Sequence, residues 1–323
     1  MNNKKWAPMI VVLAIVVIVG GYFVFRNSSK IEDHVVKIGY LPTLGSAMYD
    51  VAKENQYFEK EGIKYEMTPI QTSNQILEAL VRGDIDVSPV LSIIPILASE
   101  EVSSRKVEVF SISDYSLDRP FDKIIVKKGS SIQSIKDLAG KKIGVFPGST
   151  AMNLLKKYFS DNNVDISKIE FIQITPPTQL AALYSGSIDA LHSYEPNTTI
   201  ALESDNAREI FGSVFATQLN HSPLGVGAIS KDFVSKYPNL AKKVVGVFDK
   251  ANGEIQNNPD GVRPIIAKAF KLDQNVASKV VLVHYSKSTN IDKNIFEQYL
   301  SVLLSAGEIK SKPDISNLFF ELK

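Results

Sequence analysis

The chain has 323 residues, of which 44% are hydrophobic and 22% are charged, and its formal net charge is +1. This composition is typical of a globular protein with enough residues for one large core or two smaller ones, and the nearly neutral charge provides no basic field for nucleic acid. The absence of cysteine excludes disulfides, thiolate metal sites, thiol nucleophiles and a lipid-modified cysteine.

The N-terminus carries a long apolar run. Lys4 and Lys5 precede nineteen uncharged residues from Ala7 to Phe25, and a run of this length can span a bilayer. The flanking lysines predict that the N-terminus is cytoplasmic and that the rest of the chain lies outside. A cleaved signal peptide is the alternative, but bulky residues such as Tyr22 stand where small residues would mark a cleavage site. The sequence favours an uncleaved single-pass anchor and tether over residues 1–34, with an extracytoplasmic globular part after it.

Strands and helices alternate along the next part of the chain. Thr72 and Gln75 have the spacing of a capping box, and apolar residues at helical spacing follow them. Alternation of this kind predicts parallel strands joined by right-handed crossovers. The expected elements are a strand over residues 35–41, a helix from Ser46 to about Lys60, a strand over 64–68, a helix after Thr72 that Gly83 ends, and a strand that begins near Ile85.

The following part repeats this order and some of the sequence. Residues 143–152 read IGVFPGSTAM, and residues 38–48 read IGYLPTLGSAM, with one extra residue. ALVRGDID at 79–86 is likewise echoed by ALYSGSID at 182–189, and the offsets of 101 to 107 residues predict two similar lobes rather than a solenoid. The expected elements are strands over 142–146, 170–174 and 225–230, and helices over 151–159, 178–184, 231–237, 239–256, 261–270 and 292–306.

The segment 143–152 raises the question of a phosphate loop. A Walker loop needs a lysine after its second glycine, but no lysine enters this segment, so nucleotide hydrolysis is not expected. What remains is a strand that leads into an open helix N-terminus at Ser149 and Thr150, where free N–H groups favour an anion or a polar acceptor. One such copy would suggest an ordinary turn. Two copies at the carboxyl ends of parallel strands predict a shared ligand-binding edge.

Histidines and aspartates form no catalytic or metal-binding pattern. The four histidines, none in a zinc-binding spacing, are His34, His192, His221 and His284. His192 and His221 lie near expected loop ends and could line a site, although a structural role is favoured. Asp84, Asp86 and Asp189 recur beside Gly-x-Ile in a context typical of a helix-to-strand turn, so we expect them to cap local backbone.

Tyr194, Glu195 and Pro196 follow an apolar run at residues 188–191 that predicts a strand. They would then lie at the carboxyl end of that strand and face the same cleft as Ser149. A tyrosine and a carboxylate in this position can stack on a ligand and hydrogen-bond to it. A surface loop shaped by the proline is an equally good interpretation, and the sequence leaves both open.

Taken in order, these segments resemble a known family, the periplasmic substrate-binding proteins of ABC importers for nitrate, sulfonates and taurine. The same group contains binders of thiamine-pyrimidine precursors. Each matching segment is short, and the resemblance depends on their order and spacing over residues 35 to about 260. The segments are IGYLP at 38–42, AKENQYFEKEGI at 52–63, ALVRGDID at 79–86, DLAGKKIGV at 137–145, IDALHSYEP at 188–196 and FVSKYP at 233–238.

The resemblance implies a two-lobed α/β fold of the type II periplasmic-binding-protein class, in which each lobe is a mostly parallel sheet flanked by helices. One lobe would comprise residues 35–118 and 230–323 and the other residues 119–229, with crossings near 118–121 and 228–231. It implies a small ligand held in the cleft, with no catalytic residue, metal or cofactor. The expected ligand-binding residues are Thr43, Leu44, Gly45, Ser46, Ser73, Ser92, Ser149, Thr150, Tyr194 and Glu195.

Two departures from the family pattern bear on function. Many members carry a signal peptide or a lipid-anchoring cysteine, and here the run from Ala7 to Phe25 would replace the lipid. The segment from Ser88 to Leu91 is poorer in glycine than is usual in the family. This difference leaves the shape of that segment, and so the identity of the ligand, open.

The leading hypothesis is a monomeric, membrane-anchored receptor that is not an enzyme. It would deliver a small polar or anionic ligand of the sulfonate, taurine or nitrate type to an ABC permease and ATPase. The alternatives are a binder of a thiamine-pyrimidine-like precursor, an enzyme on the same fold, or a sensory protein. The related pyrimidine synthases carry a cysteine-rich iron motif, which this chain lacks. Two helix N-termini favour an anion and Glu195 favours an amine, so an aminosulfonate zwitterion would satisfy both.

Overall fold

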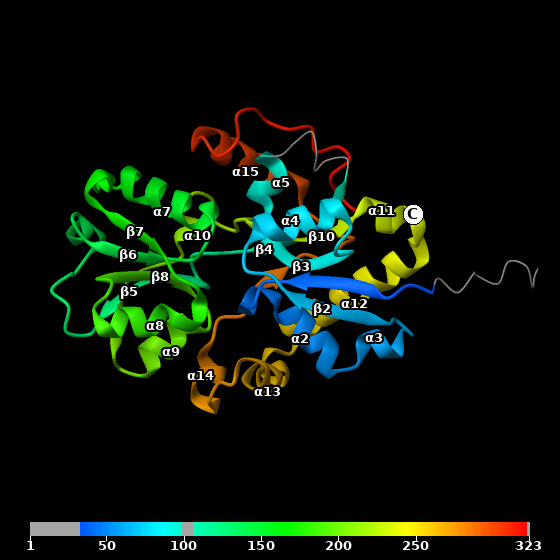
Figure 1. Cartoon of the computed structure of the whole chain (residues 1–323), viewed down its shortest axis with the longest axis horizontal. Helices are drawn as coiled ribbons and strands as arrows, with labels where there is room; N and C mark the ends of the chain where they lie inside the picture. Colours follow the sequence, from blue (N-terminus) through cyan, green and yellow to red (C-terminus); the bar gives the residue numbers. More distant parts are fainter. Residues whose placement is uncertain (1–32, 99–105, 322–323) are drawn as a thin grey trace, which may run out of the picture. The chain divides into compact units, whose positions relative to one another are not determined.

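Two β-sheets with helices on their faces make up the chain from Val35 onward (Figure 1). This computed structural model describes residues 33–98 and 106–321. Within those residues no helix combines the length and the apolar character that a bilayer crossing needs. The anchor expected from Ala7 to Phe25 lies outside the described residues.

The first sheet has six strands in the order β11-β4-β10-β3-β1-β2. β2 and β3 run parallel to β1, whereas β10 is antiparallel to both β3 and β4, and β11 is antiparallel to β4. Its strands are β1 (Val36–Tyr40), β2 (Tyr65–Pro69), β3 (Val87–Ser92), β4 (Val107–Asp114), β10 (Gly225–Ser230) and β11 (His284–Tyr285).

The second sheet has five strands in the order β7-β6-β8-β5-β9 and repeats the pairing of the first. β7 and β8 run parallel to β6, and β5 is antiparallel to β8 and β9. In each sheet four strands therefore share one direction, as expected of a mostly parallel sheet, but β5 in the second sheet and β10 and β11 in the first run against them. The reason is that β5 and β10 each enter their sheet at the carboxyl ends of its parallel strands. The strands are β5 (Asp122–Lys127), β6 (Lys142–Val145), β7 (Glu170–Gln173), β8 (Ala190–Tyr194) and β9 (Ala207–Gly212).

The expected helices agree with the structure to within a few residues, except near the N-terminus of the first lobe, whereas α5, α9, α10 and α14 were not predicted. There the single helix expected from Ser46 to Lys60 is divided, because Gln56 adopts a left-handed φ of 55°. The cap expected at Ser46 also forms no side-chain hydrogen bond. The division turns Phe58 into the core, where it is fully buried. The pieces are η1 (Leu44–Ser46), α2 (Ala47–Glu54) and α3 (Tyr57–Lys60).

The other helices cover the faces of the two sheets (Figure 1). In the second lobe α7 packs on one face of the sheet and α8 and α9 on the other, because Ile124 and Ile125 of β5 point to opposite faces. The helices are α4 (Ser73–Arg82), α5 (Ile93–Ala98), α7 (Ser149–Asp161), α8 (Pro176–Ser185), α9 (Asn197–Glu203), α10 (Val214–Thr217), α11 (Lys231–Lys236), α12 (Pro238–Asn257), α13 (Pro259–Phe270), α14 (Gln274–Lys279) and α15 (Lys293–Ser305).

The chain crosses from the first sheet to the second between β4 and β5, over residues 115–121, and returns between β9 and β10, over residues 213–224. The first crossing agrees with the position expected near residues 118–121. The return comes earlier than the one expected near 228–231, because residues 225–230 already pair as a strand of the first sheet. The chain has therefore returned to the first lobe at β10.

Close packing explains why the same glycine occurs in both copies of the repeated sequence. A Cβ on Gly39 would lie 2.5 Å from Cδ1 of Ile85, and a Cβ on Gly144 would lie 2.6 Å from Cδ1 of Ile188. These are the matching glycines and isoleucines of the two copies. In each lobe the isoleucine that precedes the third strand packs against a bare backbone in the first strand, so a side chain at the glycine would collide with it.

The repeated aspartates have a backbone partner in each lobe. Asp86 accepts a hydrogen bond from the backbone N–H of Lys37 at 2.8 Å, and Asp189 accepts one from the N–H of Lys142 at the same distance. The expected capping of local backbone is therefore wrong for these two aspartates, because the partner is an adjacent strand 49 or 47 residues away, although their role is still structural. Asp84 is exposed and pairs with Arg82.

We expect Gly144→Ala to lower the free energy of unfolding by about 1–3 kcal/mol, because the new methyl group overpacks against Ile188. Urea unfolding measures the change. Adding Ile188→Val removes the clashing Cδ1, so the double variant should lose less than the two single losses combined. Gly129→Ala is the matched control, because nothing lies within 4 Å of its Cβ position. Equal stabilities of Gly144→Ala and Gly129→Ala would contradict the packing argument.

Candidate functional site: a cleft between the lobes

A cavity lies between the two lobes at the carboxyl ends of the parallel strands. Thr43 and Gly45, which follow β1, line it from the first lobe, and Ser149 and Thr150, which begin α7, line it from the second. The two copies of the repeated sequence therefore meet over one space. This is the edge at which α/β sheets bind ligands.

Hydroxyl groups occupy one side of the cavity. Thr150 Oγ1 of the second lobe donates to Ser92 Oγ of the first at 3.3 Å. Ser73 Oγ accepts from the backbone N–H of Ser92 at 2.8 Å, which fixes the end of β3 against α4. Thr43 is only 7% exposed and lines the cavity, and its hydroxyl makes no hydrogen bond within the described residues. This side offers hydrogen bonds from both lobes, and one buried hydroxyl is free for a ligand.

The N-terminus of α7 opens onto the same space. Gly148 precedes it with a φ of 105°, a conformation that favours glycine, and no side chain caps the first turn. The N–H of Gly148 is held by Gln173 Oε1 at 3.0 Å, so the loop is fixed while the first-turn amides face the cavity end. The thirteen-residue helix adds the positive end of its dipole. By contrast, Thr72 caps α4.

Aromatic rings also line the cavity. Tyr194, at the end of β8, lies 5.0 Å from Phe146 in a stacked arrangement and 5.1 Å from Phe215, measured between ring centroids. Tyr115 lies 5.4 Å from Phe121 and 5.5 Å from Phe215. All five rings line the cavity, and we call them the aromatic wall. Burial raises the pKa of Tyr194 well above its usual value, so its hydroxyl is a neutral donor.

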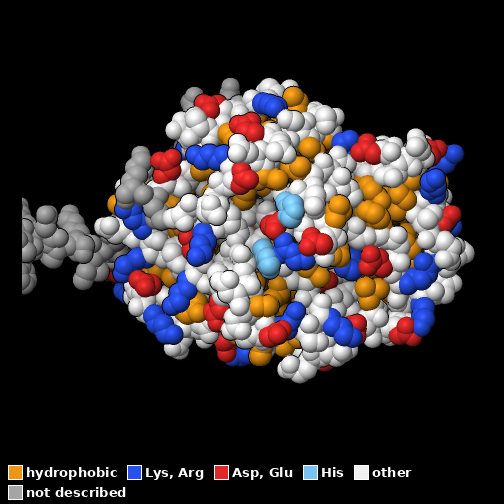
Figure 2. Space-filling model, turned by 180° about the vertical axis from the view of Figure 1, so that it is seen from behind, with side chains coloured by type: hydrophobic (Ala, Val, Ile, Leu, Met, Phe, Trp, Pro, Cys, Tyr) orange, Lys and Arg blue, Asp and Glu red, His pale blue; other side chains and the backbone are white. Residues whose placement is uncertain are grey.

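No charged side chain is among the described residues that line this cavity. Glu195 lines an adjoining cavity together with Gln179 and Asn197. Its carboxylate accepts from the Thr199 hydroxyl at 2.9 Å, and burial raises the pKa of Glu195. On the surface, acidic and basic side chains are interspersed (Figure 2), in line with the net charge of +1. Charged side chains therefore do not distinguish the cleft from the rest of the surface.

The structure brings seven of the ten expected ligand-binding residues to the cavity. The seven are Thr43, Gly45, Ser73, Ser92, Ser149, Thr150 and Tyr194. Leu44 and Ser46 are buried beside it without lining it, and Glu195 faces the adjoining cavity. Sequence reasoning missed the other four rings of the aromatic wall. Phe146 stood inside the repeated segment and Phe121 at an expected crossing, whereas Phe215 had no sequence signal.

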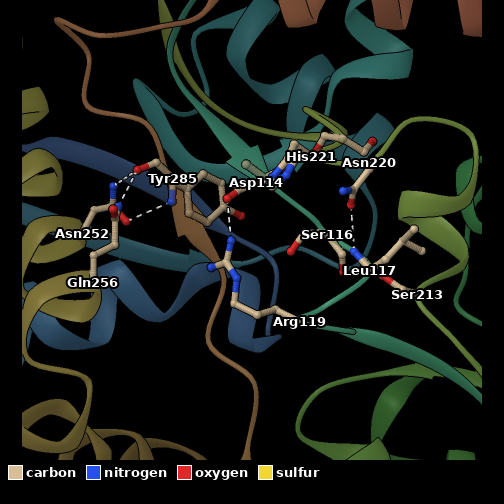
Figure 3. Close-up of polar contacts among 12 residues, drawn as sticks. Asp114, Ser116, Leu117, Arg119, Ser213, Asn220, His221, Asn252, Gln256 and Tyr285 are labelled. Carbon is tan, nitrogen blue, oxygen red and sulfur yellow. Dashed lines mark hydrogen bonds and ion pairs between the residues drawn. The ribbon is translucent and has the colours of Figure 1, made fainter.

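Two antiparallel crossing segments join the lobes beside the aromatic wall (Figure 3). The backbones of Tyr115 and Ser222 exchange hydrogen bonds of 3.2 and 2.8 Å, and Asn220 Oδ1 accepts from the N–H of Leu117 at 2.9 Å. Ser213 Oγ donates to the carbonyl of Ser116 at 2.8 Å. A short two-stranded connection of this kind can bend without disturbing either sheet, so it can act as a hinge.

Each of the two histidines near loop ends has an aspartate partner. His192 and Asp122 are fully buried, with Nε2 and Oδ2 2.8 Å apart. His221, which is exposed, lies 2.6 Å from Asp114, whose other oxygen binds Arg119 at 2.5 Å (Figure 3). Neither histidine lines the cavity, in line with the structural role that the sequence favoured.

Contacts between the lobes flank the cavity. Asn153 of α7 donates to Glu308, which follows α15, at 3.3 Å. Glu203 of α9 accepts from Asn275 of α14 at 2.8 Å and pairs with Lys279. Together with the contact between Thr150 and Ser92, these bonds bring the two lobes together around the cavity.

Two lobes that are joined by paired crossing segments and meet over one cavity define a hinged, two-lobed α/β ligand-binding protein. The chain belongs to the NMT1-like family, whose model matches residues 29–269. Three comparisons agree with this fold and describe what related proteins do.

The taurine-binding periplasmic protein of Escherichia coli (strain K12) is 27% identical over 212 residues, which are 65% of this chain and 63% of that protein. The alkanesulfonate-binding protein SsuA from Xanthomonas axonopodis pv. citri, solved with MOPS, superposes with a TM-score of 0.71 at 19% identity, over 87% of this chain and 96% of that one. A ligand-binding component of an ABC-type import system from Staphylococcus aureus, solved with zinc, gives a TM-score of 0.72 at 16% identity, over 89% and 97%. The relatives are binding proteins, in agreement with the expectation that this chain is not an enzyme.

Proposed function

We propose that this protein is the extracytoplasmic solute-binding component of an ABC importer and that it closes on a small sulfonate-type anion between its lobes. The observation that carries the proposal is the cavity itself. Thr43 and Gly45 from one copy of the repeated sequence and Ser149 and Thr150 from the other line the same space. A ligand there contacts both lobes and so favours the closed state over the open one.

The open start of α7 and the hydroxyls of Thr43, Ser92, Ser149 and Thr150 are suited to a compact oxyanion. Backbone N–H groups and the helix dipole favour negative charge, and hydroxyls donate to its oxygens. The head group would take the place of the direct contact between Thr150 and Ser92 and bridge the lobes. Ser73 and Tyr194 complete the proposed set of contacts.

The N-terminal run from Ala7 to Phe25 is proposed as a single-pass anchor. It would hold a monomeric binding unit on the extracytoplasmic side, close to the permease and ATPase that take up the ligand. The periplasmic location named for the taurine-binding relative supports this side of the membrane. The lobe boundary at residue 118 is proposed as the sequence placed it, and the return is proposed before residue 225 rather than at residue 229, because residues 225–230 pair within the first sheet.

We expect Ser149→Ala and Thr150→Ala each to weaken sulfonate binding by roughly tenfold, the effect of losing one hydrogen bond to a charged group. Calorimetric titration of the full chain with ethanesulfonate measures it. Ser160→Ala, an exposed change on the same helix outside this cavity, is the control. Failure of every small sulfonate to bind at millimolar concentration would exclude the proposed function, and unchanged affinity in both variants would exclude this part of the site.

A further inference from the structure

The cavity is lined by two chemically different kinds of group. Hydroxyl and backbone N–H groups come from Thr43, Ser92 and the start of α7, and five aromatic rings line the same space. Leu41, Val90, Leu91 and Leu224 extend the apolar surface. A ligand that is polar throughout would leave this apolar area without a partner.

We propose that the preferred ligand is an anion that carries a flat, ring-bearing apolar body and no ammonium group, such as an arenesulfonate. The acid head group meets the hydroxyls and the start of α7, and the ring lies against the aromatic wall. This inference rests on the proposed function and narrows its ligand class.

We infer a ring in the ligand because five aromatic side chains line the cavity. Tyr115, Phe121, Phe146, Tyr194 and Phe215 contact one another in a continuous series, with centroid separations from 5.0 to 6.2 Å. Their surfaces toward the cavity gain most from covering another flat apolar group, by burial and by ring–ring contact. A ring on the ligand covers more of this wall than a one- or two-carbon chain does.

We infer that the ligand has no ammonium group because no acidic side chain of the described residues lines the cavity. An ammonium group buried without a carboxylate loses its hydration uncompensated. Glu195 binds Thr199 and lines the adjoining cavity, and the stacked rings of Phe146 and Tyr194 line both cavities. The positive end of α7, which lines the same cavity, also disfavours a cation.

Matched ligand pairs test the two halves of the inference in the full chain by calorimetric titration. Benzenesulfonate against methanesulfonate isolates the ring, and we expect benzenesulfonate to bind at least tenfold more tightly. Ethanesulfonate against taurine isolates the ammonium group, and we expect taurine to bind at least tenfold more weakly. Phe146→Leu removes one ring but keeps an apolar side chain, and it should reduce the preference for benzenesulfonate over methanesulfonate by at least threefold. Phe211→Leu, at a ring that stacks on Tyr158 outside the cavity, should leave that preference unchanged.

Each outcome has a separate meaning. If the sulfonates bind but benzenesulfonate has no advantage, or taurine equals ethanesulfonate, the inference is wrong and the proposed function stands. If an uncharged 4-amino-2-methylpyrimidine binds more tightly than benzenesulfonate, the anionic part of the inference is overturned. If no sulfonate binds, the proposed function itself fails, and the inference fails with it.

Discussion

Replacing Asp122 with alanine is expected to lower the free energy of unfolding by about 3–5 kcal/mol, because it removes one partner of a buried, hydrogen-bonded pair and leaves the other partner unsatisfied. Asp122 begins β5 directly after the first crossing, and it and His192 are both fully buried. One carboxylate oxygen lies 2.8 Å from His192 Nε2, and the other accepts from the N–H of Phe215 at 3.3 Å. Its loss would leave the imidazole without this partner beneath the aromatic wall.

A second aspartate–histidine pair in the same protein provides the matched control. Asp114 and His221 are joined at 2.6 Å but are 36% and 57% exposed, so Asp114→Ala should cost only about 0–1 kcal/mol. Urea unfolding of both variants, followed by far-UV circular dichroism, measures the difference. Equal losses in the two variants, or a loss below about 1 kcal/mol for Asp122→Ala, would contradict the argument from burial.

The elements of the fold could largely be predicted because their signals are local. Thr72 caps α4 through the N–H of Gln75, and Gly83 and Gly186 end helices in the left-handed conformation at matching places in the two lobes. The mixed direction of the sheets could not be predicted in this way. It depends on which sheet β5 and β10 join after the crossings, and pairing across more than sixty residues leaves no local pattern in the sequence.

The candidate site could likewise be predicted only in part. Its hydroxyls could be predicted, because residues at strand ends and helix starts meet at one edge whenever the strands are parallel. Most of the aromatic wall could not, because Tyr115, Phe121 and Phe215 belong to the crossing segments or to the short helix α10. In sequence these residues are indistinguishable from core residues. Glu195 was assigned to the right strand end, but its carboxylate faces the adjoining cavity, where Thr199 holds it.

Replacing Asp50 with asparagine is expected to stabilise the protein at alkaline pH. Asp50 lies in the first turn of α2, and burial raises its pKa from 3.8 to about 7, while the charge of Lys53 opposes this only in part. Such a shift corresponds to at most about 4 kcal/mol, and residual contact with solvent reduces it to about 2 kcal/mol. Asparagine has a similar shape and carries no charge that must be desolvated.

The sign of the pH dependence follows from proton binding. Below about pH 4 the carboxyl group is protonated in both states and costs nothing. Between about pH 4 and pH 7 the folded protein keeps a proton that the unfolded chain releases, so the free energy of unfolding falls as the pH rises. Above about pH 7 the loss is complete. The gain from Asp50→Asn should therefore be near zero at pH 4, grow through this window and stay at about 2 kcal/mol at pH 8.

Urea unfolding of the wild type and Asp50→Asn at pH 4.5, 6 and 8 measures this dependence. Other carboxyl groups also titrate over the range, so the free energies of unfolding of the two proteins are compared at each pH. Asp84→Asn is the control, because Asp84 is exposed and its pair with Arg82 is exposed as well, and its effect should stay below about 1 kcal/mol throughout. A gain that is the same at all three values, or that is largest at pH 4.5, would show that burial of the Asp50 charge is not what limits stability in α2.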